Sequence, residues 1–242
     1  MLISEPAPTQ ADLHFRLFGF PVRIHPFFWV VSLILGMGGL GSGKADPTET
    51  LIWVVVVFVS ILVHELGHAF TQRRFGGHPW ITLYSFGGLA SCNDCDRSPR
   101  SQIIISLAGP FAGFFLAGFV ISILIALQRF RGFELDWVAV NWVPFKSRLD
   151  VAVLFLLFVN IAWGLVNLLP IYPLDGGQIA RELFTLGNPR SGIVQSLQLS
   201  AGAAVLVAVY ALTKRDLFMC LMFGFLAYGS FQTLQMYRNR WR

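Results

Sequence analysis

Charged side chains are scarce in this sequence. Only 13% of the 242 residues are Asp, Glu, Lys or Arg, 55% are hydrophobic, and the mean hydropathy is +0.63. About one-quarter of the residues in a typical soluble domain are charged. The scarcity therefore excludes an ordinary soluble globular domain and indicates a chain that contacts lipid.

Long polar stretches are also lacking: the longest are Gln72–Gln102 and Gln128–Asp150, too short for a separate soluble domain. The first 24 residues contain no early apolar run, so no cleavable signal peptide is expected. Basic and aromatic residues do not interleave. The net charge of +5 is therefore interpreted as attraction to anionic lipid, and not as nucleic-acid binding.

Cysteine is rare, with three residues in the chain. Cys92 and Cys95 form a C-x-x-C motif, which alone is a weak signal. Thioredoxin-like chemistry would need a βαβ context, and a structural zinc site would need a second pair of ligands. The two residues are expected to be reduced, solvated thiols, and Cys220 is expected to be a small core residue.

Apolar runs of about twenty residues recur along the chain, and a helix of that length crosses a bilayer core of roughly 30 Å. They predict an α-helical polytopic membrane protein with about six transmembrane helices, in a single domain over residues 1–242. The first predicted span is short and Gly-rich, and the fifth needs the polar sequence QSLQLS before it to reach full length. The predicted spans are Pro26–Gly41, Leu51–Phe70, Ile103–Leu127, Val151–Leu169, Ser200–Leu212 and Leu217–Leu234.

Basic residues favour the cytosolic side of a membrane. With the N-terminus in the cytosol, eleven of the 18 Lys and Arg residues lie in inside segments and seven lie in outside loops. Both termini are then expected in the cytosol, in a protein embedded in the cell membrane.

Of the 13 acidic residues, only Glu65 and Asp175 lie in or directly beside a predicted span. An ionisable group at bilayer depth costs about 2.5–3.5 kcal/mol on the insertion scale. Glu65 belongs to the motif HELGH, in which His64 and His68 lie one helical turn apart on one face. Two such histidines bind zinc, and the glutamate handles a proton of the bound water. The alternative is an interfacial histidine pair with Glu65 bound to a nearby arginine, which explains the buried charge poorly.

A catalytic zinc site needs a further protein ligand. The sequence NLLPIYPLDGGQIARELF offers Asp175, because Pro170 and Pro173 end an apolar helix just before it. The glycines after Asp175 permit another helix to approach closely. Asp175 is expected to be an oxygen ligand, and the alternative is that it caps the following helix.

HELGH in an early span and NLLPIYPLDGG after a later one resemble the site-2 proteases, which are intramembrane zinc metalloproteases. GFPVRIHPFFWV, ITLYSFGGLA and SLAGPFAG are similar to that family's lead into the first span, its β-hairpin and the start of its third span. The layout is similar to the compact six-span branch. Many members carry PDZ or CBS modules that are not recognised here, so regulation is expected to be absent or supplied by a separate protein.

The resemblance implies that His64, His68 and Asp175 hold one zinc ion and that Glu65 is the general base. Asn167, eight residues before Asp175, would orient substrate or stabilise the oxyanion. It also implies a membrane-spanning protein as the substrate and the lipid bilayer as the surroundings. Where many members place an asparagine three residues after Pro110, this chain has Gly113.

Two β-compatible runs flank Gly87-Gly88 and predict a small membrane-associated hairpin over residues 81–92, between the second and third spans. An unwound substrate could pair with its edge as an added strand, so Leu83, Tyr84 and Phe86 are predicted substrate-binding residues. The alternative is an interfacial loop anchored by aromatic residues.

Two other functions are considered. A zinc or proton transporter would need ionisable residues in several spans, and the last four predicted spans contain none. A catalytically silent membrane scaffold that retains the zinc site is the stronger rival. Because no residue of the two motifs is missing, the sequence favours an active zinc endopeptidase that cleaves within or near a transmembrane segment.

Overall fold

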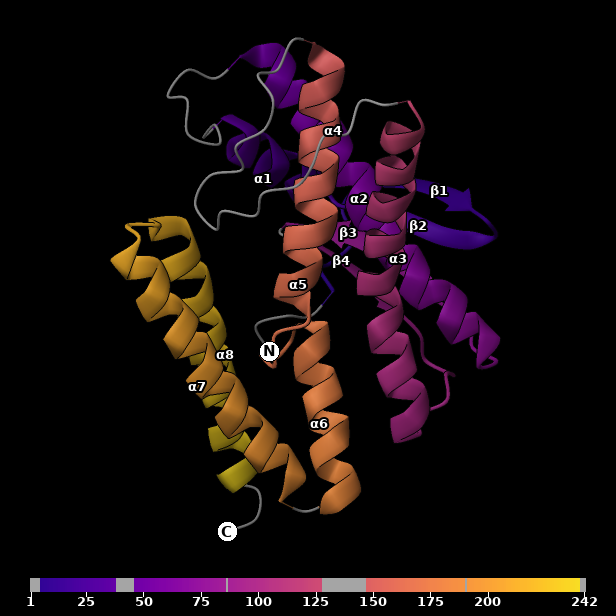
Figure 1. The fold of residues 1–242 in the computed structure, drawn as a ribbon. Helices are drawn as coiled ribbons and strands as arrows, with labels where there is room; N and C mark the ends of the chain where they lie inside the picture. Colours follow the sequence, from indigo (N-terminus) through magenta and orange to yellow (C-terminus); the bar gives the residue numbers. More distant parts are fainter. Residues whose placement is uncertain (1–4, 38–45, 86, 128–146, 190, 240–242) are drawn as a thin grey trace.

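The computed structural model describes residues 5–37, 46–85, 87–127, 147–189 and 191–239 (Figure 1). Five helical segments in this part of the chain are long and apolar enough to cross a membrane, and a shorter apolar helix, α1 (Pro26–Met37), precedes them. The five are α2 (Pro47–Arg74), α3 (Pro99–Ala126), α4 with η1 and α5 (Arg148–Asn167), α7 (Gly192–Thr213) and α8 (Leu217–Asn239).

The predicted α-helical membrane fold is confirmed, and each predicted span overlaps a helix. The fifth begins at Gly192 and not at Ser200, because the polar sequence before the apolar run is itself helical. The end of the first predicted span, residues 38–41, lies outside the described residues. The helix starts follow local sequence: Asp46 and Ser98 cap α2 and α3, and each is followed by a proline at the first helical position.

The fourth span is not a uniform α-helix. α4 (Arg148–Phe158) passes into a π-helical turn, η1 (Val159–Trp163), before α5 (Gly164–Asn167). Asn160 in this turn is buried, and its amide nitrogen donates to Ser60 Oγ on α2 at 2.8 Å. This polar contact ties the fourth span to α2 one helical turn before His64.

A four-stranded sheet packs beside α1 and α2, in the order β1-β2-β3-β4. β2 pairs with β3 in parallel, and the two outer pairs are antiparallel. Phe20, Val22 and Ile24 alternate along β2 and are buried in the core with residues of α1 and α2. The strands are β1 (Leu13–Leu17), β2 (Phe20–Ile24), β3 (Trp80–Tyr84) and β4 (Gly87–Ser91).

The predicted hairpin is present as β3 and β4, but its turn is placed differently and it belongs to a larger sheet. Gly87 and Gly88 are not the turn: they are the first residues of β4, where they pair with Tyr84 and Leu83. The hairpin is also not isolated, because β1 and β2 extend the sheet on the β3 side. β3 is therefore an interior strand.

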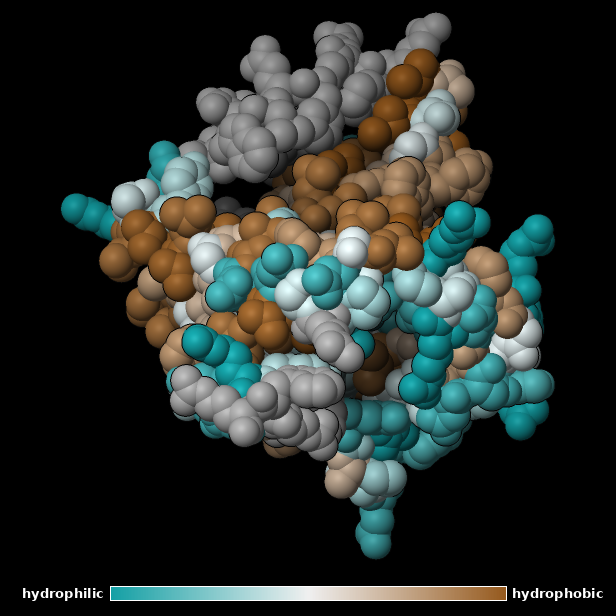
Figure 2. Space-filling model, turned by 90° about the horizontal axis from the view of Figure 1, so that it is seen from below, coloured by the Kyte–Doolittle hydropathy of each residue, from teal (hydrophilic) through white to brown (hydrophobic). Residues whose placement is uncertain are grey.

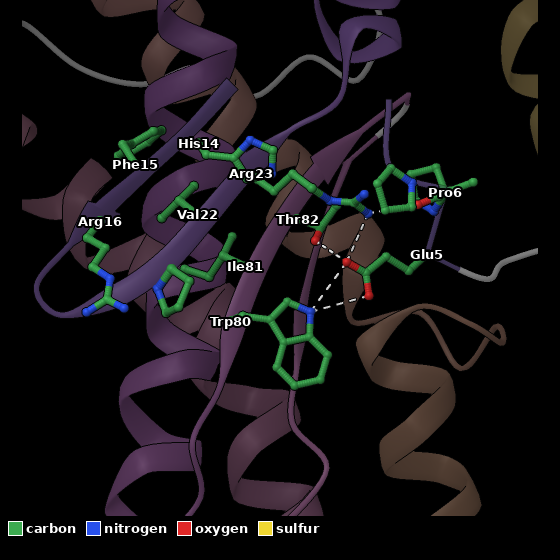
Figure 3. A pocket seen from close by; sticks show the side chains of 13 residues that line it. Glu5, Pro6, His14, Phe15, Arg16, Val22, Arg23, Trp80, Ile81 and Thr82 are labelled. Carbon is green, nitrogen blue, oxygen red and sulfur yellow. Dashed lines mark hydrogen bonds and ion pairs between the residues drawn. The ribbon is translucent and has the colours of Figure 1, made fainter. Parts of the chain in front are cut away.

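The N-terminal segment is fixed to the outer face of the sheet through Glu5 (Figure 3). Its carboxylate accepts hydrogen bonds from Thr82 Oγ1 at 2.5 Å and from the Trp80 indole at 3.3 Å, and it forms an ion pair with Arg23 at 3.0 Å. A groove of about 920 Å³ surrounds these residues. The outer face of β2 and β3 therefore carries a cluster of bound polar groups among apolar side chains, whereas the inner face packs on α2.

The remaining helices are joined to the rest of the fold through α6. α6 (Asp175–Gly187) packs against α3 and α7, while α7 and α8 pair with each other (Figure 1). Viewed from the end where α6 and the C-terminus lie, much of the surface is hydrophilic, and hydrophobic side chains lie around it (Figure 2). This distribution fits a protein that presents this end to water and its sides to lipid.

The cysteine prediction was also wrong in part. Cys92 and Cys95 were expected to be reduced, but they form a disulfide directly after β4. Cys220 is a free, half-buried residue in α8.

Candidate metal centre

Two histidines on α2 form one side of the site. His64 and His68 lie one turn apart, and their Nε2 atoms are 3.2 Å from each other. The Nδ1–H of His68 donates to the main-chain carbonyl of Ile105 on α3 at 2.7 Å. This hydrogen bond leaves Nε2 of His68 as the ring nitrogen with a free lone pair, which is the form that binds a metal.

Asp175 forms the other side and reaches the histidines from the start of α6. Its Oδ2 lies 3.1 Å from Nε2 of His64, and its Oδ1 lies 3.4 Å from Nε2 of His68. Asp175 is the first residue of α6, the N-cap is Leu174, and no side chain caps this helix. The capping alternative is therefore not the arrangement in this structure.

The tight turn before α6 depends on small residues. A Cβ on Gly176 would lie 2.1 Å from the carbonyl oxygen of Leu168, so the backbone of the turn passes directly against the start of α6. A larger residue would push this turn away from α6. The glycine after Asp175 thus helps to place its carboxylate beside α2.

The three side chains fit zinc. Zinc bonds of about 2.0–2.1 Å to imidazole nitrogen and carboxylate oxygen put tetrahedral ligands roughly 3.3 Å apart. The observed separations of 3.1, 3.2 and 3.4 Å match this spacing. Three protein ligands leave a fourth position for water or substrate, as in catalytic zinc sites.

The close approach of α3 shapes the same site. A Cβ on Gly109 would lie 2.2 Å from Nε2 of His68 and 2.8 Å from Nε2 of His64. On α2, a Cβ on Gly67 would lie 2.4 Å from the carbonyl oxygen of Ala108. A side chain at either position would clash with the facing helix, so the two glycines allow α3 to pack over the histidines.

Glu65 lies between the histidines in sequence and is 5% exposed. It does not pair with Arg73, whose guanidinium donates to the Phe18 carbonyl. Instead it faces β4: a Cβ on Gly88 would lie 2.4 Å from Glu65 Cγ, and the main-chain amide of Ala90 faces the Glu65 carboxylate. β4 is thus the strand that borders Glu65, the candidate general base.

The other predicted residues are placed differently. Asn167 is the half-buried last residue of α5, and its side chain makes no hydrogen bond within the described ranges.

Tyr84 ends β3, where burial and the nearby Glu65 and Glu5 carboxylates raise the pKa of its phenol. Leu83 is fully buried and pairs with Ile24 on one side and Gly88 on the other. Phe86 lies outside the described residues.

The prediction for Leu83 is therefore corrected: neither its side chain nor its paired backbone is available to a substrate. Of the two edge strands of the described sheet, β1 and β4, the one that borders Glu65 is β4.

Three features near the site were missed from the sequence. Gly88 and Gly109 leave space that Glu65 and His68 fill, and Asn160 occupies space beside Gly113. A Cβ on Gly113 would lie 3.2 Å from Asn160 Oδ1. The signal available in the sequence was the row of small residues in SLAGPFAG, but it does not identify their neighbours.

Comparisons with known proteins agree with this geometry. A family model described as Peptidase family M50 matches residues 52–152 and 145–209. The zinc metalloprotease MJ0392 of Methanocaldococcus jannaschii is 25% identical over 227 residues, which cover 90% of this chain and 59% of that protein. The putative zinc metalloprotease Rip3 of Mycobacterium tuberculosis is 30% identical over 217 residues, which cover 80% of this chain and 51% of Rip3.

A solved structure shares the fold. The site-2 protease from Methanocaldococcus jannaschii matches with a TM-score of 0.60 at 23% identity, over 92% of this chain and 95% of that chain. The chain spans about three-fifths of the length of MJ0392 and about half of the length of Rip3.

The approach of α3 to the histidines can be tested with one methyl group. Gly109→Ala should reduce bound zinc to a small fraction of the wild-type amount, because the new Cβ would overlap His68 Nε2. Gly118→Ala is the matched control, since nothing lies within 4 Å of a Cβ at that position of the same helix. Zinc per chain, measured by atomic emission on detergent-purified protein, is the readout. Equal zinc in the two variants would contradict the contact.

Proposed function

The chain belongs to peptidase family M50, and from this premise we propose that it is an intramembrane zinc metalloendopeptidase. One observation carries the proposal: two imidazoles and a carboxylate converge at zinc-ligand spacing, with a buried glutamate beside them. This set provides three ligands, an open position and a base, which are the parts that metal-assisted hydrolysis needs. We propose that these parts act within one catalytic domain.

The proposed chemistry divides between the metal and the chain. Bound zinc would lower the pKa of a coordinated water to about 7 and polarise the scissile carbonyl. Glu65 accepts a proton from the attacking water and returns it to the leaving amine. Its burial beside His64 and His68 keeps it close to the ligands and away from competing cations.

Two polar side chains are candidates for the oxyanion. Asn167 directly precedes Leu168, whose carbonyl packs on Gly176, so its backbone lies near the start of α6. A donor in this role contributes about 3–4 kcal/mol to transition-state stabilisation where it has been measured. Tyr84 carries a phenol O–H that can donate to the substrate from the end of β3.

We propose a membrane-spanning protein as the substrate, cleaved within or near its transmembrane segment. The peptide bond in a helix is shielded, so the substrate must unwind before it is cleaved. The edge of β4 can hold the unwound segment at Gly88. At Ala90 the outward peptide groups face α2 and are already bound, because the carbonyl accepts from Gln72 Nε2 at 3.0 Å and the amide faces Glu65. Gly88 has the same orientation along the strand and lies beside Glu65. A substrate paired at Gly88 would therefore lie extended next to the base.

We further propose that the protein lies in the cell membrane with both termini in the cytosol. Arg73 and Arg74 at the end of α2, Arg100 at the start of α3 and Arg181 within α6 support this orientation, because basic residues are retained on the cytosolic side. Any regulation by another chain would then involve a separate cytosolic or membrane protein.

The role of Glu65 predicts a separation of metal binding from turnover. Glu65→Gln should keep one zinc per chain and lower cleavage of a membrane-spanning substrate by about 10²–10⁴-fold, because an amide cannot accept the proton. His68→Ala is the matched control and should lose both zinc and cleavage. Zinc analysis and a cleavage assay on the same preparations give the result. Near-normal turnover by Glu65→Gln would remove Glu65 from the mechanism.

Strand pairing predicts a periodic response in the substrate. A synthetic transmembrane substrate can carry one N-methyl group at a time across the cleaved segment. Because alternate N–H groups of an extended strand face the same edge, methylation should slow cleavage at every second position. The cleavage rate of each peptide, with binding measured on Glu65→Gln, is the readout. A uniform effect along the segment would argue against pairing with β4.

Orientation is tested by reporter fusions. A reporter after Arg242 should give a cytosolic signal, and one inserted within residues 41–50 should give the opposite signal. The same sign at both positions would mean that the number of spans or the orientation is wrong.

A further inference from the structure

The disulfide between Cys92 and Cys95 is packed against the end of α2. A Cβ on Gly77 would lie 2.2 Å from Cys95 Sγ and 2.5 Å from Cys92 Sγ, so the glycine backbone packs directly against both sulfur atoms. Sγ of Cys95 also lies 3.9 Å from the main-chain oxygen of Gln72. The pair therefore contacts the last turn of α2 and the residues that follow it.

Cys92 and Cys95 come directly after β4 in the sequence. Cys92 follows Ser91, the last residue of the strand, and Ser91 is paired with Trp80 of β3. The Gln72 side chain donates to the Ala90 carbonyl, which binds the strand to α2 just before the disulfide. β4 is thus held by the disulfide at its end and borders Glu65 at Gly88 near its beginning.

The sulfur atoms are reachable from a polar cavity of about 490 Å³. Both cysteines line it, together with Arg97 before α3 and Arg181 on α6. Gln72 also lines it, and its buried Oε1 has no hydrogen-bond partner. A cavity of this size admits a small thiol compound, whose thiolate is the reactive species. Charges of both signs lie at the site, because Glu182 lines the cavity 3.9 Å from Arg181 and Asp94 Oδ1 lies 3.2 Å from Cys92 Sγ.

We propose that Cys92 and Cys95 are a reversible redox site whose oxidised form anchors the end of β4. The co-reactant is a low-molecular-weight thiol or a dithiol. Its thiolate attacks one sulfur of the pair to form a mixed disulfide, and a second thiol then releases the reductant in its disulfide form. Overall, the Cys92–Cys95 disulfide gains two electrons and two protons and becomes two thiols, while two reductant thiols become one disulfide.

A metal site is the competing use of these side chains. Cys92, Asp94 and Cys95 have donor atoms within 4.8 Å of one another, and His78 is bound to Asp94 at 2.6 Å. The bond between the two sulfur atoms favours the redox site, because thiolate ligands and a disulfide exclude each other. The experiment below distinguishes the two uses.

The first test counts thiols in the folded protein. Cys220→Ala removes the third cysteine, and the protein is alkylated with and without prior treatment with dithiothreitol, then measured by intact mass spectrometry. We expect no adduct before reduction and two adducts after it, without loss of the folded state. Cys92→Ser in the same background is the control and should give one adduct in both samples.

Two results would overturn the redox site. One is alkylation of both cysteines without reductant, together with a second zinc ion per chain, which would indicate a metal site. The other is a disulfide that dithiothreitol reduces only after the protein unfolds, which would indicate a purely structural bond.

The second test concerns the anchoring of β4. Amide hydrogen exchange in residues 87–95 should become roughly three- to tenfold faster after reduction, since loss of the cross-link favours local opening. The Cys92→Ser/Cys95→Ser variant should show the same increase with or without dithiothreitol, and α8 should be unchanged. Equal exchange in the oxidised and reduced wild-type protein would refute the anchoring role. A slower cleavage rate after reduction is expected only if the proposed protease function holds, whereas thiol counts and exchange do not depend on it.

Discussion

Buried ionisable side chains set the main constraint on this molecule. His64, Glu65 and His68 lie on an apolar helix, and such groups are costly at bilayer depth unless they bind partners. Asp175 comes from the start of another helix and meets both imidazoles at 3.1 and 3.4 Å. The path of the chain between α5 and α6, the turn at Gly176 and the contact of α3 through Gly109 all serve to make this meeting possible.

Small residues on neighbouring elements let these elements pack closely around the candidate active site. Gly109 lets α3 cover the histidines, and Gly88 lets β4 lie directly against Glu65. The same strand carries outward peptide groups toward α2 and ends at the Cys92–Cys95 disulfide. The proposed base, the proposed docking edge and the proposed redox site are therefore consecutive features of one short segment. A change at the end of β4 has a direct structural route to Glu65.

The sequence was sufficient for the membrane fold and for the residues that converge on the candidate site. The length of the apolar runs predicts the helices. The spacing of His64 and His68 and the Pro–Gly turn at Asp175 identify the candidate zinc ligands, because each of these signals lies within a short stretch of sequence. It was insufficient for contacts between distant segments. The parallel pairing of Val22 with Ile81 makes β3 an interior strand and buries Leu83, and no local pattern specifies that pairing. Likewise, the need for glycine at Gly88 and Gly109 is visible only once Glu65 and His68 lie against them.

The central claim is that two imidazoles and one carboxylate, from α2 and α6, hold a zinc ion of catalytic type. X-ray absorption at the zinc edge of the purified protein tests it most directly, because nitrogen and oxygen ligands at about 2.0–2.1 Å are distinct from sulfur at about 2.3 Å. We expect one zinc per chain with four light-atom ligands, two of them imidazoles, and loss of this signal in Asp175→Ala. Sulfur ligands, or an unchanged spectrum and zinc content in Asp175→Ala, would contradict it.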